Sequence, residues 1–151
     1  MPRFEVITQI DASPERVFDA CLEVEMHTAS MAGSGESAVG GVRSGRLGEG
    51  DHVTFQGRHF GLRWRLAARV SGLDRPHSFV DDQERGPFKR WHHAHHFAPD
   101  GNGGTVMRDV IDYAAPLGPL GALVERIGLH RYMVRLIRIR NRYLKEVLES
   151  S

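Results

Sequence analysis

Residues 62–70 carry the feature that most constrains the fold, an alternation of apolar side chains with mainly basic ones. The apolar series is Leu62, Trp64, Leu66, Ala68 and Val70, and it alternates with Arg63, Arg65, Ala67 and Arg69. A period of two is typical of a β-strand that buries one face and exposes the other. The chain must therefore supply a second layer that covers the apolar face of a sheet.

Similar strand patterns flank this segment and predict an antiparallel sheet of about seven strands. Turn residues separate them, such as Arg75-Pro76 and the run at 100–104, which favours a tight hairpin. The predicted strands cover residues 4–10, 36–42, 52–60, 62–70, 78–84, 89–97 and 105–113.

Two helical patterns complete the chain. Ser13 as N-cap and Pro14 at the first helical position begin a helix that we expect to end near Met26. Residues 120–148 carry apolar side chains at helical spacing, which predicts one long C-terminal helix. Only this helix is large enough to cover the sheet. The sequence therefore predicts an α+β fold in which a curved sheet wraps around the C-terminal helix and leaves a ligand cavity between the two layers.

Composition narrows the class of protein. The 151 residues suit one domain spanning 1–151, and the formal charge of +1 gives no reason to expect nucleic acid as a partner. Cys21 is the single cysteine, so no internal disulfide can form. Glu5 and Asp11 interrupt the stretch that a signal peptide would need, and no run approaches the ~18 apolar residues of a membrane span. We expect a cytoplasmic protein without a membrane span.

The order of elements resembles the START-like, or SRPBCC, superfamily with its helix-grip fold. Residues 7–25 carry the Ala-x-Pro-x-x-Val-Phe pattern typical of that superfamily's first strand and helix, and residues 76–97 and 103–121 are similar to a bacterial branch of it. The residues that match the branch are Phe79, Asp81, Gln83, Gly86, Pro87, Phe88, Trp91, His93, His95, Phe97, Gly104, Thr105, Asp109 and Tyr113. The superfamily includes polyketide cyclases, coenzyme-Q-binding proteins and plant allergens. The resemblance implies the fold over almost the whole chain, and it does not choose among binders, enzymes and accessory proteins.

Strand periodicity places polar residues on the inward face. If Trp91 and Phe97 face the helix, so do His93 and His95 between them. A core tolerates such groups only if each is paired, so two interpretations stay open: a network that specifies packing, or the polar end of a ligand site. The predicted ligand-binding residues are Trp64, Leu66, Phe79, Asp81, Gln83, Trp91, His93, His95, Phe97, Met107, Asp109, Tyr113, Ile127, His130, Val134 and Asn141.

The favoured function is binding of a small hydrophobic or amphipathic ligand of lipid, polyketide or aromatic type. The first alternative is a cyclase, dehydratase or hydrolase whose catalytic candidates are His93, His95, Asp109 and Tyr113. The second is a protein or RNA interaction module that uses the basic face of the C-terminal helix, where few aromatic residues are available for base stacking.

Metal binding is a separate question. His93 and His95 with Asp81 or Asp109 have the donor types of a metal site. Histidine pairs on strands are common without metal, and the resemblance implies none. We therefore expect no metal and no other cofactor. The expected partner is a small molecule and not a nucleic acid, with a homodimer as an open alternative to a monomer.

Overall fold

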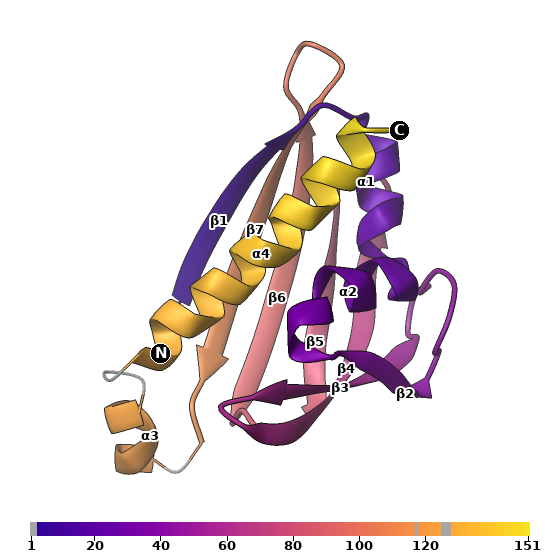
Figure 1. Ribbon diagram of the computed structural model, residues 1–151. Coiled ribbons are helices and arrows are strands. Elements are labelled where there is room, and N and C mark those ends of the chain that lie inside the picture. The colour runs from indigo at the N-terminus through magenta and orange to yellow at the C-terminus, as the bar shows by residue number, and fades with distance from the viewer. Residues whose placement is uncertain (1–2, 117, 125–127) are drawn as a thin grey trace.

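The structure is a computed structural model that describes residues 3–116, 118–124 and 128–151. Its seven strands form one antiparallel sheet in the order β1-β7-β6-β5-β4-β3-β2 (Figure 1). The strands are β1 (Arg3–Ile10), β2 (Ser37–Gly41), β3 (His52–His59), β4 (Leu62–Asp74), β5 (Ser78–Arg85), β6 (Arg90–Pro99) and β7 (Thr105–Ala114). The predicted antiparallel sheet is confirmed.

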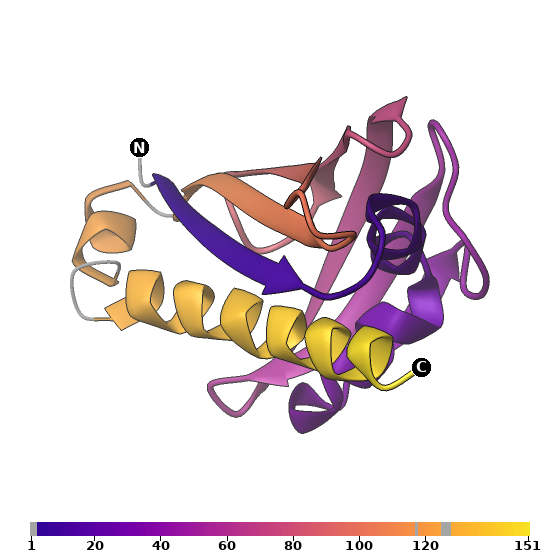
Figure 2. The same cartoon turned by 90° about the horizontal axis from the view of Figure 1, so that it is seen from above.

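The helices lie on one side of this sheet. They are α1 (Pro14–Cys21), α2 (Val24–Ser30), the short 3-10 helix η1 (Ala32–Ser34), α3 (Gly118–Val124) and α4 (His130–Glu149). Figure 2 shows α4 lying along one face of the curved sheet, with α1 and α2 beside its C-terminal half. The arrangement is the predicted α+β helix-grip fold.

The first helix begins as predicted and ends earlier. The backbone N–H of Arg16 donates to Oγ of Ser13 at 3.3 Å, which caps α1. The expected continuation to Met26 is wrong, because Glu23 leaves the helix and forms an isolated β-bridge with Arg46. The chain then re-enters a helix at α2.

The C-terminal helix is also interrupted. The prediction of one helix over 120–148 is wrong, because α3 and α4 are separate elements, and Gly128, two residues before α4, has a φ of 156° that an α-helix does not have. The 20 residues of α4 span about 30 Å. The predicted cavity residue Ile127 lies outside the described residues. Val134 is only half-buried, and the buried side chains of α4 are Met133, Ile137, Arg140, Asn141, Leu144 and Leu148.

Polar residues separate two apolar clusters under α4. One cluster lies near α1 and includes Phe97, Met107 and Leu144. The other lies near the N-terminal end of α4 and includes Trp91, Ile111 and Ile137. On β6, β7 and α4 the residues between these clusters are His93, His95, Asp109, Arg140 and Asn141, all of them buried. We call these five residues, together with Asp81 of β5, the polar layer.

Candidate functional site

A cavity of about 370 Å³ lies between the sheet and the helices α2 and α4. Its wall is mainly apolar, with Phe55, Leu66 and Phe79 from the sheet and Leu136 and Ile137 from α4. The volume falls in the range of small-molecule sites. Four members of the polar layer, Asp81, His93, His95 and Arg140, complete the wall.

Strand pairing brings the polar layer together. Asp81 of β5 is the direct partner of His93 on β6, and His95 is the direct partner of Asp109 on β7. Partners on adjacent strands have neighbouring side chains on the same face of the sheet. The predicted inward direction of His93 and His95 is confirmed, because their exposed fractions are 4% and 3%.

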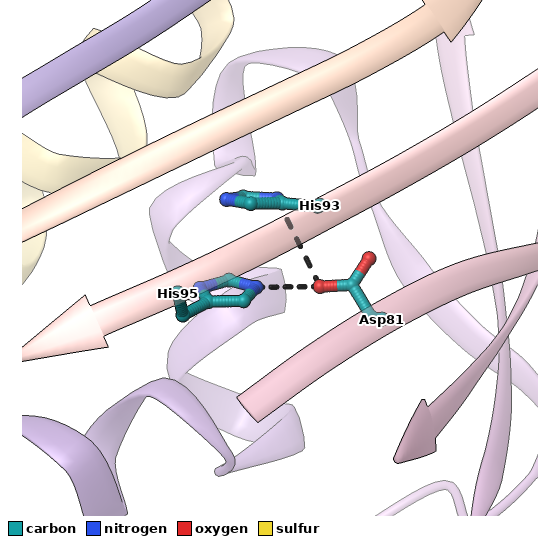
Figure 3. Close-up of side chains that lie close together, drawn as sticks. All are labelled: Asp81, His93 and His95. Atoms are coloured by element: carbon teal, nitrogen blue, oxygen red, sulfur yellow. Dashed lines mark hydrogen bonds and ion pairs between the residues drawn. The ribbon is translucent and has the colours of Figure 1, made fainter. Parts of the chain in front are cut away.

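His93 links the two carboxylates of the layer. Its Nε2 lies 2.7 Å from Oδ1 of Asp109, and its Nδ1 lies 3.8 Å from Oδ2 of Asp81 (Figure 3). Burial and the neighbouring charge of His95 lower the pKa of His93 to about 4. The imidazole is therefore neutral near pH 7. Because a carboxylate can only accept, the proton of the ring lies on Nε2 and the lone pair on Nδ1.

His95 stacks on His93 but has the opposite electrostatic character. The two ring centroids are 3.7 Å apart with an interplanar angle of 17°. Nε2 of His95 donates to Oδ2 of Asp81 at 2.6 Å, and its Nδ1 is 3.4 Å from Oδ1 of Asp109. Burial lowers the pKa of His95, but the bonds to Asp109 and Asp81 outweigh burial, so the pKa is raised. Adjacent imidazoles therefore differ in their preference for a proton.

Asp109 is the fully buried centre of the layer, with no solvent exposure. Besides His93, it accepts from Nη1 of Arg140 at 3.3 Å and from Nδ2 of Asn141 at 2.8 Å. Burial raises the pKa of Asp109, but the charge of Arg140 and the histidine bonds lower it well below its usual range. Among the described residues, no fully buried side-chain nitrogen or oxygen lacks a hydrogen-bond partner. The layer meets the requirement for placing charge in a core.

Nine of the predicted ligand-binding residues lie on the cavity wall or directly behind it. Those that line the cavity are Trp64, Leu66, Phe79, Asp81, Trp91, His93 and His95. Asp109 and Asn141 lie behind this wall and hold His93 and Arg140 in place.

The other predicted ligand-binding residues that the structure describes hold a turn or pack in the core. The side chain of Gln83 bonds both backbone groups of Phe88 and holds the turn between β5 and β6. Tyr113 lies in the core, where its hydroxyl is 3.1 Å from Nδ1 of His130. Phe97 and Met107 pack in the apolar cluster near α1. The cavity wall does not include the predicted residues Gln83, Phe97, Met107, Tyr113, His130 and Val134.

Sequence reasoning missed Arg140. Arginines on the last helix are expected to face solvent, yet Arg140 is only 6% exposed. The signal was present, since Met133, Ile137, Arg140 and Leu144 follow each other at steps of four, three and four residues, which is the spacing of one helix face.

A second carboxylate–histidine pair lies on the cavity wall, outside the polar layer. Nε2 of His27 on α2 is 2.7 Å from Oε1 of Glu36, and the imidazole stacks on Phe55 at 4.0 Å. Both His27 and Glu36 line the cavity. Sequence analysis gave neither a role in the site.

Asp81, His93 and His95 have ligand atoms within 4.8 Å of one another, which is the spacing of a metal site. The two imidazole planes are nearly parallel, so their in-plane lone pairs do not converge on one point. At least one ring would have to rotate before both could bind the same ion. As placed, the three residues fit a hydrogen-bond network, and the absence of a metal remains a prediction.

Cys21 lines the cavity but is a poor nucleophile or metal ligand. Burial raises the pKa of its thiol to about 12. Its Sγ lies 3.8 Å from the sulfur of Met107. The residue therefore acts as a small apolar side chain.

Comparison with known proteins identifies the fold through solved structures. No protein-family model and no curated protein matches the chain. The protein TTHA0849 from Thermus thermophilus matches with a TM-score of 0.79 and 19% identity, over 96% of this chain and 95% of that one. A START superfamily protein from Mycobacterium smegmatis matches with a TM-score of 0.74 and 14% identity, over 98% and 97%. Ara h 8.0201 matches with a TM-score of 0.71 and 11% identity, over 99% of both chains.

Within the described ranges, no helix has the length and apolar character needed to cross a membrane. The similarity to the solved structures extends over nearly the full length of the chain. In this chain, α4 packs against a seven-stranded sheet. The chain has the START-like, helix-grip fold.

Proposed function

We propose that the chain binds a small amphipathic molecule in the cavity between the sheet and α4. The observation that carries this proposal is the cavity of about 370 Å³, whose apolar wall ends on the polar layer. A well-formed apolar pocket with a few convergent polar groups is typical of a ligand site. START-like neighbours with 11–19% identity support the fold and leave the ligand open.

Filling the cavity tests this proposal. Ala68 is buried on the cavity wall, while the adjacent Ala67 lies on the other face of β4. We expect Ala68→Leu to weaken binding of the neutral dye Nile red by about tenfold or more, and Ala67→Leu to leave it unchanged. Fluorescence titration measures both. Equal binding by the two variants, or no binding by the wild type, would contradict the proposal.

A second candidate function is proton-transfer catalysis. The observation that favours it is the opposed pKa shifts of the two stacked imidazoles, lowered in His93 and raised in His95. Neighbouring groups whose pKa values are pushed apart are typical of an acid–base pair. In this function, Nδ1 of His93 would take a proton from a carbon acid in the cavity.

Exchange of α-protons in 2-tetralone tests this second function. The C–H bond breaks, Nδ1 of His93 gains the proton, and deuterium from the solvent later returns to carbon. NMR in D₂O is expected to show exchange faster than in buffer, lost in His93→Gln and retained in His96→Gln, whose ring lies on the outer face of β6. Exchange at the buffer rate in the wild type would exclude this activity for a ketone of this class.

Other expectations stay predictions. These are a single domain over 1–151, a cytoplasmic location, the lipid, polyketide or aromatic character of the ligand, and the choice between monomer and homodimer. The basic outer face of α4 adds no support for the interaction-module alternative, because the two aromatic residues of this helix, Tyr132 and Tyr143, are half-buried rather than exposed.

A further inference from the structure

Apart from the imidazoles, the charged groups on the cavity wall are mainly carboxylates. Among the described residues the wall has three carboxylates, Glu23, Glu36 and Asp81, and one arginine, Arg140. Glu23 lies toward solvent with its side chain 42% exposed, whereas Glu36 and Asp81 are 11% and 22% exposed. Two carboxylates therefore face the interior of an apolar cavity.

The single arginine has its charge already paired. Nη1 of Arg140 is 3.3 Å from Oδ1 of Asp109 and 3.1 Å from Oδ1 of Asn141. Asp109 is completely buried, so withdrawing Arg140 from it would leave an uncompensated charge in the core. A negatively charged ligand would have to compete with Asp109 for this guanidinium group.

Two atoms of the polar layer, Oδ1 of Asp81 and Nδ1 of His93, are open hydrogen-bond acceptors. Oδ2 of Asp81 accepts from His95, while Oδ1 has no donor among the residues that the structure describes. Among the described residues, Nδ1 of His93 also has no hydrogen-bond partner, and it lies 3.8 Å from Oδ2 of Asp81. Both residues belong to the cavity wall, and Figure 3 shows the carboxylate of Asp81 at the edge of the two stacked imidazoles.

We infer that the polar end of the ligand is a hydrogen-bond donor without negative charge, best a protonated amine and next a hydroxyl group. Carboxylates and phosphates are excluded because a second anion would be placed against Asp81 in an apolar surrounding, where like charges are poorly screened. The inference rests on the proposed function, and it adds the chemical class of the ligand.

Three naphthalene compounds of nearly equal size test this inference. They are 2-naphthylmethylamine, 2-naphthalenemethanol and 2-naphthoate, which at about pH 7.5 carry a positive charge, no charge and a negative charge. Displacement of Nile red from the wild type gives their affinities. We expect the amine to bind most tightly and the carboxylate to bind about tenfold or more weaker than the alcohol.

Asp81→Asn and Asp82→Asn form a matched pair of variants. Asp81→Asn removes the cavity charge, so we expect the naphthoate to gain about tenfold and the amine to lose its advantage over the alcohol. Asp82 bonds His92 on the other face of β5, so Asp82→Asn is expected to keep the wild-type order. Circular dichroism checks that both variants are folded. If one of them is not, the order of the three affinities in the wild-type protein still tests the inference.

The outcomes separate the two proposals. A naphthoate that binds as well as the alcohol, or an order that Asp81→Asn leaves unchanged, overturns the inference while the proposed cavity function stands. Failure of all three compounds and of Nile red to bind the wild type overturns both.

Discussion

The two sides of the polar layer differ in how completely their charges are paired. On the side of α4, Asp109 is fully buried and accepts from His93, Arg140 and Asn141. On the cavity side, Asp81 is partly exposed and has one hydrogen bond, from His95. A carboxylate with a full set of buried donors stabilises the core, whereas one with an open lone pair in a cavity is available to a ligand. The comparison assigns a structural role to one carboxylate and a binding role to the other.

The largest expected effect comes from breaking the buried side. Arg140→Ala leaves the charge of Asp109 without its cation, which we expect to lower the free energy of unfolding by about 3–5 kcal/mol. Urea denaturation measures this loss. Arg138→Ala, at an exposed position two residues earlier on α4, is the control and is expected to change stability by less than about 0.5 kcal/mol. Equal effects of the two variants would show that the buried ion pair does not support the fold.

The next effect is a loss of stability in acid. The pKa of His93 is lowered from 6.5 to about 4 in the folded protein, so between these values the unfolded chain binds a proton that the folded protein does not. The free energy of unfolding therefore falls by about 3 kcal/mol as the pH drops from 6.5 to 4. The raised pKa of His95 changes the free energy of unfolding only above pH 6.5. The lowered pKa values of Asp81 and Asp109 change it only below about pH 3.8.

Urea denaturation at a series of pH values measures this slope. His93→Gln keeps an amide donor for Asp109 but cannot titrate, so we expect a flatter dependence between pH 6.5 and 4. His92→Gln, on the outer face of β6, is the control and should keep the wild-type slope. A slope that survives in His93→Gln would assign the acid lability to another group.

A smaller effect is expected on the cavity side. Asp81→Asn keeps the shape of the side chain and removes a carboxylate that has one hydrogen bond, so we expect a loss of at most about 1 kcal/mol in the free energy of unfolding. The same urea experiment compares it with Arg140→Ala. A loss as large as that of Arg140→Ala would mean that both sides of the layer are structural.

Zinc is expected to have the smallest effect. Because the imidazoles of His93 and His95 are nearly parallel, we expect purified protein incubated with Zn²⁺ and dialysed to retain well below one equivalent by metal analysis. One equivalent that is lost in His93→Gln and kept in His92→Gln would show that the rings rotate to bind an ion.

Local periodicity explains which parts of the site could be predicted. The inward direction of His93 and His95 follows from the period of a strand, and the pairing of successive strands from β3 to β7 follows from their short antiparallel connections. The exclusion of Asp109 from the cavity could not be read in the same way, since periodicity gives the face of a residue and not its depth below α4. The prediction that Tyr113 lines the cavity is wrong for the same reason.

The helical errors have a different origin. The spacing of apolar residues over 120–148 does not reveal the positive φ of Gly128, because a glycine adopts positive and negative values of φ about equally readily. Arg140 was overlooked because its residue type suggests solvent, although its position matches the buried face. The contact of His27 with Glu36 joins α2 to the segment before β2, and no spacing rule predicts it.

The position of the polar layer between the two apolar clusters limits how α4 can dock. A slide of α4 along its axis by one turn would move Arg140 in among the apolar side chains near Ile137 or near Leu144, and Asp109 would lose its counter-ion. Apolar contacts alone would tolerate such a displacement far better, since they have no directional preference. We therefore expect the polar layer to fix the register of α4 on the sheet. Because α4 forms part of the cavity wall, this register also sets the dimensions of the cavity.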